Sequence, residues 1–133
     1  MTITETCTGC TACAKVCPTG AISGEKKGQH TIEARLCIEC GACGRICPKE
    51  SVFNDKGEKI ARLKRSEWPK PIINEKACYA CENCVEACPV NALSMLDEDL
   101  PLEKNHAALA QPNKCIACGW CVKNCVFDAI EGF

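Results

Sequence analysis

The sequence predicts a small protein of short helical turns and short strands, divided into two modules that follow one another along the chain. Its 133 residues contain sixteen cysteines, but only three Phe, two Trp and one Tyr are available to fill a core. The cysteines form four copies of one motif, and a Trp-Pro-Lys-Pro segment at 68–71 lies between the second copy and the third. Because a chain this short buries a limited fraction of its surface, more than hydrophobic packing must hold each module together.

All sixteen cysteines fit the spacing C-x2-C-x2-C-x3-C, with none left over. The four copies are Cys7, Cys10, Cys13 and Cys17; Cys37, Cys40, Cys43 and Cys47; Cys78, Cys81, Cys84 and Cys88; and Cys115, Cys118, Cys121 and Cys125. A proline follows the last cysteine of the first three copies, whereas Val126 follows that of the fourth. This repetition indicates that one structural unit is used four times.

Disulfides, structural zinc and iron–sulfur ligation compete as uses for these cysteines. Disulfides need an oxidising compartment, and the residues before Cys7 lack the basic start and apolar run of a secretory signal. No apolar stretch is long enough for a membrane span, so we expect a reduced, cytoplasmic protein. Four zinc sites would also use sixteen cysteines, but zinc sites usually join two separated C-x2-C pairs. The pattern therefore favours iron–sulfur ligation.

The spacing has a physical reason. Three cysteines at intervals of three on a tight loop direct their thiolates at three iron atoms of one cubane. The fourth begins on a helical turn that carries it away, so it ligates a second cluster, and the following proline ends the turn and leads into a strand. Such motifs come in reciprocal pairs, and four of them predict four [4Fe–4S] clusters.

On these residues the sequence resembles the bacterial two-cluster ferredoxins and the polyferredoxins that repeat them. The resemblance covers 7–47 and 78–125, and it extends to the residues after the fourth cysteine: Pro-Thr-Gly-Ala-Ile at 18–22, Pro-Val-Asn-Ala-Leu at 89–93 and Val-Phe-Asp-Ala-Ile at 126–130. It implies an α+β fold of two tandem ferredoxin-type modules. Each module would have two short helices and two hairpins around two [4Fe–4S] clusters in a pseudo-twofold arrangement.

The elements along the chain indicate which motifs pair. A strand is expected at Thr2–Glu5 before the first motif, and a turn at 27–29 in the 19-residue connector to the second. The 30-residue connector to the third motif contains a predicted hairpin at 51–63, then the Pro-containing linker, then a new strand at 72–74. The last connector has 26 residues, with an insertion around 97–106. The new strand at 72–74 favours sequential pairing, in which the first motif pairs with the second and the third with the fourth. The alternative is nested pairing of the first motif with the fourth and of the second with the third, which resembles the iron–sulfur subunits of molybdopterin oxidoreductases.

Sequential pairing predicts a first module at 1–66 including its C-terminal hairpin, a linker at 67–71 and a second module at 72–133. The expected ligands are Cys7, Cys10, Cys13 and Cys47 for cluster one and Cys37, Cys40, Cys43 and Cys17 for cluster two. Those for cluster three are Cys78, Cys81, Cys84 and Cys125, and those for cluster four are Cys115, Cys118, Cys121 and Cys88. Metal loading and folding should then be one event.

Charge is unevenly distributed, with a formal sum of +1 over 1–54, +3 over 55–76 and −5 over 77–133. The basic strip at 59–70 and the acidic insertion at 97–103 are either ordinary solvated surface or docking sites for different partners. Nucleic-acid binding is not expected, because the chain as a whole is acidic, with a formal net charge of −1. His30 and His106 are expected to be exposed turn residues and not metal ligands.

No catalytic motif accompanies the cysteines: the sequence has no phosphate-binding glycine loop and no dinucleotide fingerprint. We therefore expect an electron-transfer protein of anaerobic metabolism without a small-molecule substrate. It would be the iron–sulfur subunit of a larger oxidoreductase, such as a tungsten or molybdenum enzyme, a hydrogenase or a formate dehydrogenase, together with a second donor or acceptor protein. The alternative is a freely diffusing polyferredoxin, and an iron–sulfur sensor is a third class that full ligation of every cluster disfavours.

Overall fold

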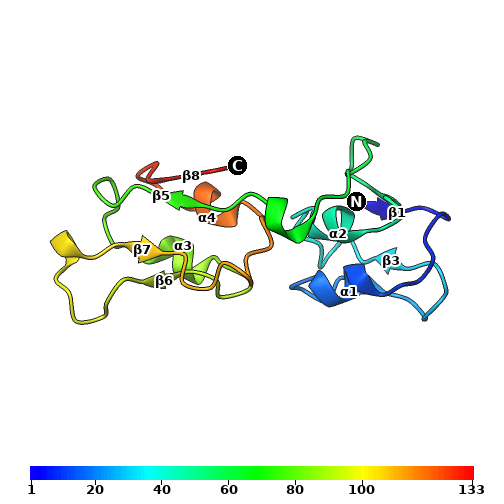
Figure 1. Ribbon diagram of the computed structural model, residues 1–133, viewed down its shortest axis with the longest axis horizontal. Helices are drawn as coiled ribbons and strands as arrows, with labels where there is room; N and C mark the ends of the chain where they lie inside the picture. Colours follow the sequence, from blue (N-terminus) through cyan, green and yellow to red (C-terminus); the bar gives the residue numbers. More distant parts are fainter. The chain divides into compact units, whose positions relative to one another are not determined.

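The computed structural model describes residues 1–133 and divides them into two compact units, Met1–Trp68 and Pro69–Phe133. Each unit contains two short α-helices and two antiparallel sheets of two strands each (Figure 1). The boundary between the units falls inside the segment 67–71. No helix has the length and hydropathy that crossing a membrane requires.

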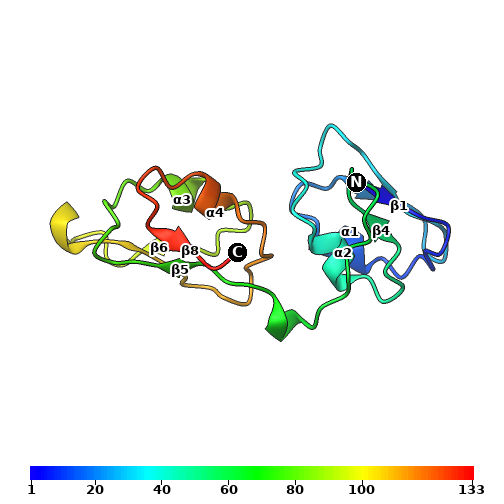
Figure 2. The same cartoon turned by 90° about the horizontal axis from the view of Figure 1, so that it is seen from above.

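In unit 1 the first strand pairs with the last. β1 (Thr2–Ile3) lies antiparallel to β4 (Val52–Phe53), and β2 (Ile22–Ser23) lies antiparallel to β3 (Thr31–Ile32). Because β1 precedes the first cysteine motif and β4 follows the second, this pairing brings the two motifs together. The helices α1 (Ala12–Val16) and α2 (Ala42–Ile46) lie side by side within the unit (Figures 1 and 2).

Unit 2 repeats this order. β5 (Ile72–Ile73) pairs with β8 (Ile130–Glu131), and β6 (Ser94–Met95) pairs with β7 (Ala107–Ala108). The helices are α3 (Asn83–Glu86) and α4 (Trp120–Lys123), which pack together. The insertion between β6 and β7 carries the 3-10 helix η2 (Leu102–Lys104) and is closed by the buried Asn105, whose side chain donates a 2.7 Å hydrogen bond to the Asp97 carbonyl.

The first two helices end where the sequence places proline. Cys17 ends α1 with ψ 118° and Cys47 ends α2 with ψ 116°, both extended. A proline ring clashes with a helical conformation of the residue before it, so the prolines at 18 and 48 impose this exit from the helix. The chain then runs toward the strands β2 and β4.

The core of each unit consists largely of cysteines and aliphatic side chains. In unit 1 the buried cluster is Cys13, Ile22, Cys43, Cys47 and Val52, and in unit 2 it is Cys84, Leu93, Ala107, Cys121 and Ile130. Neither cluster contains a buried aromatic side chain. Apolar burial of this size stabilises a fold as small as each unit only weakly.

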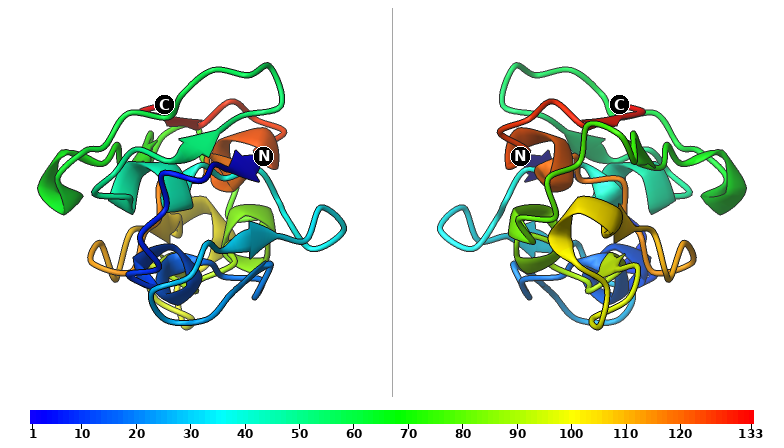
Figure 3. Two further views of the ribbon diagram at one scale, coloured as in Figure 1. Left: turned by 90° about the vertical axis from the view of Figure 1, so that its right-hand side faces the viewer. Right: turned by 90° about the vertical axis from the view of Figure 1, so that its left-hand side faces the viewer.

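Residues 54–68 of unit 1 fold back onto α2. The segment starts with a turn in which the Asn54 side chain accepts the backbone N–H groups of Lys56 and Glu58, and this loop stands out from the unit in Figure 3. It is then anchored where the Leu63 N–H donates to the Arg45 carbonyl at 3.0 Å, and it ends in the 3-10 helix η1 (Arg65–Glu67).

Trp68 lies in the predicted linker but is only 2% exposed. Its indole N–H donates to the Leu63 carbonyl at 3.1 Å, and the guanidinium groups of Arg45 and Arg65 lie 5.2 and 4.0 Å from its ring centroids. Cation–π contacts of this kind stabilise a desolvated ring. Trp68 is therefore part of the packing of unit 1.

The expectation that His30 is exposed is wrong, since the residue is only 1% exposed. Its Nδ1 lies 3.1 Å from the Gly28 carbonyl, and Gly24 approaches the ring so closely that a Cβ at that position would lie 2.7 Å from it. The turn between β2 and β3 therefore folds back over its own histidine.

Candidate iron–sulfur centres

Four cavities in the structure are each lined by four cysteines. Unit 1 holds one cavity lined by Cys7, Cys10, Cys13 and Cys47 and another lined by Cys37, Cys40, Cys43 and Cys17. Unit 2 holds one lined by Cys78, Cys81, Cys84 and Cys125 and another lined by Cys115, Cys118, Cys121 and Cys88. We number these cavities one to four after the clusters expected in them. All sixteen cysteines are free thiols.

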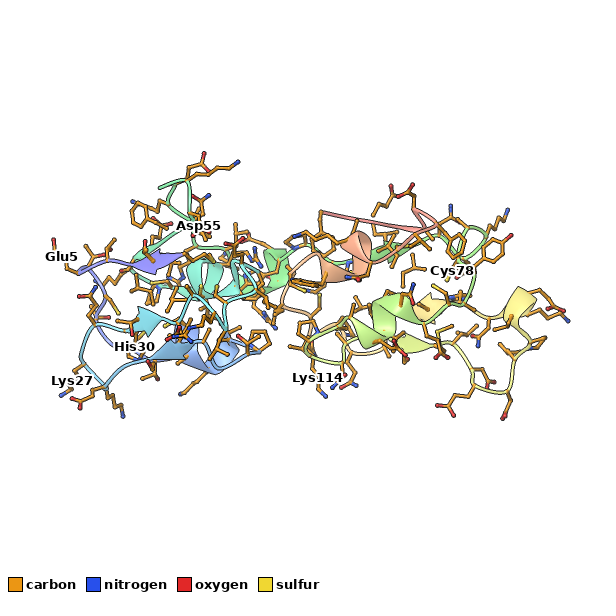
Figure 4. The ribbon with its side chains drawn as sticks, turned by 180° about the vertical axis from the view of Figure 1, so that it is seen from behind. Glu5, Lys27, His30, Asp55, Cys78 and Lys114 are labelled. Carbon is orange, nitrogen blue, oxygen red and sulfur yellow. The ribbon has the colours of Figure 1, made fainter.

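Each cavity takes three cysteines from one motif and the fourth from the other motif of the same unit. The strand pairings β1–β4 and β5–β8 produce this exchange, because they join the start of one motif to the end of its partner. Cys78 lies on the segment that leads from β5 into α3 (Figure 4). The four groups of cysteines are the sets that sequential pairing predicts, and nested pairing would have grouped them across the two units.

The backbone around the cavities repeats one unusual conformation. Positive φ angles occur in every motif at the second residue after the first cysteine, at the first residue after the second cysteine and at the third residue after the fourth cysteine. These residues are Gly9, Thr11, Gly20, Glu39, Gly41, Glu50, Ala80, Glu82, Asn91, Ala117, Gly119 and Asp128. Left-handed residues next to right-handed ones turn successive N–H groups toward one side and form concave sites for anions, including iron–sulfur clusters. Most of the twelve are not glycine, so the loops accept a conformational cost at these positions.

Backbone N–H groups also approach the sulfur atoms. The amide four residues after the fourth cysteine donates to its sulfur in three motifs, from Ser51 to Cys47 at 3.4 Å, from Ala92 to Cys88 at 3.3 Å and from Ala129 to Cys125 at 3.3 Å. In the first motif the Ala21 amide bonds to Cys17. Hydrogen bonds to sulfur stabilise added negative charge on a cluster and so adjust its potential.

The sequence contains a signal for these donors in addition to the cysteine spacing. A small residue, Ala or Ser, recurs four positions after each fourth cysteine, and all four are at most 2% exposed. Of the glycines inside the motifs, Gly9 donates its N–H to Cys7 Sγ at 3.4 Å, and Glu39 makes the equivalent bond to Cys37 Sγ. A residue with a side chain therefore makes the same bond as glycine at this position. What the position requires is the backbone N–H group and not the lack of a side chain.

The third cysteine of each motif lies on a helix and is buried. Burial raises the pKa of the Cys43 thiol to about 12 and those of Cys84 and Cys121 to about 11, and it also raises the pKa of Cys13. At Cys17 burial acts in the same direction, but hydrogen bonds from Thr19 and nearby amides outweigh it and lower the pKa. Since a metal binds the thiolate, loading the buried positions must release protons.

The residues present fit [4Fe–4S] clusters. Four thiols, inward N–H groups and aliphatic walls such as Ile3 and Val52 in cavity one or Leu93 and Ile116 in cavity four suit an anionic cluster screened from water. No group of three or more His, Cys, Asp or Glu side chains is arranged to hold a single metal ion. The four thiols around each cavity match in number the four iron atoms of one [4Fe–4S] cluster.

Comparison with known protein families agrees with this fit. Profiles of the 4Fe–4S dicluster domain match residues 6–52, 36–92 and 77–129. The match over 36–92 combines the second motif with the third, whose cysteines line different cavities. The dicluster domains and the sixteen cysteines together fit four [4Fe–4S] clusters.

Several curated proteins share this sequence pattern. The polyferredoxin protein MvhB of Methanothermus fervidus is 34% identical over 124 residues, which are 91% of this chain and 19% of that protein. Hydrogenase-4 component A of Escherichia coli (strain K12) and indolepyruvate oxidoreductase subunit IorA of Pyrococcus abyssi (strain GE5 / Orsay) are each 32% identical over 75 residues, or 55% of this chain and 31% and 11% of theirs. The chain thus spans less than a third of each of these relatives.

Among solved structures, a chain of the formate dehydrogenase–heterodisulfide reductase–formylmethanofuran dehydrogenase complex from Methanospirillum hungatei is similar at 24% identity with a TM-score of 0.41. The similarity covers 96% of this chain and 52% of that chain.

Proposed function

Because the chain belongs to the family of 4Fe–4S dicluster ferredoxin domains, we propose that it transfers electrons through four [4Fe–4S] clusters as the iron–sulfur component of a larger oxidoreductase. Each unit holds two clusters in a pseudo-twofold arrangement, and their ligands are the four cysteines of each cavity. The observation that carries this proposal is the exchange of the fourth cysteine between the two motifs of each unit.

The residues of the chain have separable roles in this function. When bound, the clusters supply one-electron chemistry. The cysteines hold them, the amides of Ala21, Ser51, Ala92 and Ala129 donate to the sulfur atoms, and the aliphatic walls exclude water. The chain needs no substrate site of its own, because a partner enzyme performs the bond chemistry and a second protein supplies or removes electrons.

The type of partner is proposed from the relatives. Two of them are named as a hydrogenase component and an oxidoreductase subunit, which supports a larger redox enzyme as the partner. We propose that this enzyme is cytoplasmic and of the hydrogenase, formate dehydrogenase or tungsten/molybdenum type. The similarity to a polyferredoxin supports a second candidate function, that of a freely diffusing electron carrier.

Anaerobic purification without a tag from the cells that produce the protein tests both parts of the proposal. We expect about sixteen iron and sixteen acid-labile sulfide per chain, as four cubanes require, and reduction signals typical of [4Fe–4S] clusters in EPR. Stable co-elution with an oxidoreductase in fixed stoichiometry supports the subunit role. A pool of monomer that carries all the iron contradicts it and leaves the diffusing carrier.

A further inference from the structure

An aromatic patch with two stacked rings covers cavity three, whereas the lining of cavity four includes a single exposed aromatic residue, Phe133. We define the aromatic patch as the rings of Tyr79 and Phe127 together with Val126, which precedes Phe127 in the chain. Tyr79, Val126 and Phe127 are 70%, 72% and 41% exposed. The rings of Tyr79 and Phe127 stack with centroids 4.6 Å apart and planes at 18°, and both residues line the cavity of Cys78, Cys81, Cys84 and Cys125. Single exposed apolar residues are ordinary, whereas large exposed residues gathered at one place are candidates for an interaction site.

The four repeats give an internal comparison that isolates this patch. Tyr79 follows the first cysteine of its motif, where the other motifs have Thr8, Ile38 and Ile116. Phe127 is the second residue after a fourth cysteine, where the others have Thr19, Lys49 and Val90. Val126 replaces the proline that follows the fourth cysteine elsewhere. The ferredoxin-type loop therefore does not require large exposed side chains at these positions.

We propose that the aromatic patch is the docking surface for the second redox partner, a protein whose electron-transfer centre is ringed by basic side chains. This inference rests on the proposed function and adds where and with what chemistry the partner binds. Contact there would place the partner against cluster three, whose ligand Cys81 is itself exposed.

Charge around the patch identifies the chemistry of the partner. Glu82 lines the same cavity and Asp128 follows Phe127, and both carboxylates are exposed and form no ion pair within the chain. The sequence from 77 to 133 carries eight acidic and three basic residues. A basic rim on the partner would be attracted to these carboxylates and orient its centre over the rings.

The size of the patch indicates a transient partner. Redox encounters use the smallest specific interfaces, whereas permanent subunit contacts bury 2,000 Å² or more. Three exposed side chains with two flanking carboxylates suit the former class. We therefore assign the patch to the partner that binds and leaves and not to the permanent oxidoreductase subunit.

The test uses the holoprotein and zinc-substituted cytochrome c, a basic, redox-inert probe, in a binding titration at low ionic strength. The variant Y79T/F127T introduces threonine, which the chain itself has at the equivalent positions 8 and 19. We expect the Kd to rise on the order of tenfold or more, because truncating central aromatic contacts removes most of the binding energy of a small interface. Y79F, which keeps the stacked ring, should bind like the natural protein.

The matched control is L36T/L63T, which removes two exposed leucines (50% and 39% exposed) from unit 1 without changing charge. It should leave the Kd unchanged. An equal loss of affinity in this control, or an unchanged Kd in Y79T/F127T, overturns the proposal. So does sedimentation showing that the natural protein forms a dimer that Y79T/F127T separates, because the occupant is then a second copy.

If Y79T/F127T loads fewer than four clusters, the variant E82Q/D128N decides the question, since it keeps both rings. We expect it to weaken the dependence of the Kd on salt, and an unchanged salt dependence overturns the proposal. Different results contradict the proposed function and the proposed docking surface. A holoprotein whose clusters take up no electron from an electrode at any potential accessible to [4Fe–4S] clusters contradicts the electron-transfer function. A reducible protein with a patch-independent Kd contradicts only the docking surface.

Discussion

Replacing Gly44 with alanine should loosen the segment 54–68 from unit 1. Gly44 lies on α2, directly after Cys43, where the other three motifs have Ala14, Val85 and Val122. A Cβ at this position would lie 2.4 Å from the Ile60 Cβ and 2.5 Å from its Cγ2. The chain thus has glycine at this one of four equivalent positions because Ile60 packs directly on the helix.

Two effects of the G44A substitution oppose each other. Ordinary contact begins near 3.4 Å, so Ile60 must retreat by about 1 Å. Overpacking a core in this way costs about 2 kcal/mol. Alanine inside a helix stabilises it by about 1 kcal/mol relative to glycine. The net result is a destabilisation of about 1 kcal/mol, located between α2 and the segment.

Native-state hydrogen exchange of the anaerobic holoprotein measures this change at two amides. The Ile60 N–H donates to the Val52 carbonyl and the Leu63 N–H donates to the Arg45 carbonyl, each at 3.0 Å, so their exchange reports opening of the segment. Both should exchange about fivefold faster in G44A, since a tenfold change corresponds to about 1.4 kcal/mol. A14G on α1 is the control and should leave both amides unaffected. Slower exchange in G44A would falsify the packing argument, because helix propensity alone would then dominate.

Three further outcomes are expected. C47S should abolish the EPR signal of cluster one although Cys47 belongs to the second motif, and an intact cluster one with a missing cluster two would contradict the assigned ligand sets. W68A should speed iron release from unit 1 to a chelator at least tenfold, because loss of a buried tryptophan costs about 3–5 kcal/mol, whereas iron release from unit 2 should not change. Removing iron should unfold the chain, and near-native circular dichroism of the iron-free protein would refute that coupling.

The cysteines that line each cavity could be inferred from the sequence because their grouping depends on covalent spacing, and the cluster ligand sets themselves stay a prediction. Three thiols at intervals of three share a loop, and the fourth leaves on a helical turn that proline ends. Which motifs pair depends on where a new strand begins, and Ile72 and Ile73 after the proline-containing segment provided that signal. Each of these inferences rests on neighbours in sequence, so a single sequence was sufficient to make it.

Contacts between residues distant in sequence could not be predicted in the same way. The segment that contains Trp68 and Pro69 has the composition of a linker. Trp68 is nevertheless buried, because two arginines and the Leu63 carbonyl surround it. His30 occurs in a polar turn and is buried because the turn folds back so that Gly24 meets its ring. In both cases tertiary packing decides the exposure and local composition does not.

The charged segments are held in place by specific contacts, which bears on how the protein selects partners. The basic strip 59–70 includes residues tied to α2 through Leu63 and Trp68, and the acidic insertion 97–103 is closed by Asn105, which bonds to the Asp97 carbonyl. A charge on an ordered segment keeps a defined position, and it therefore contributes to the orientation of an encounter as well as to its rate. The same repeat thus produces two units with the same donor sets but different surfaces, because sequence differences outside the cysteine spacing leave cluster ligation unchanged and are free to specify partners.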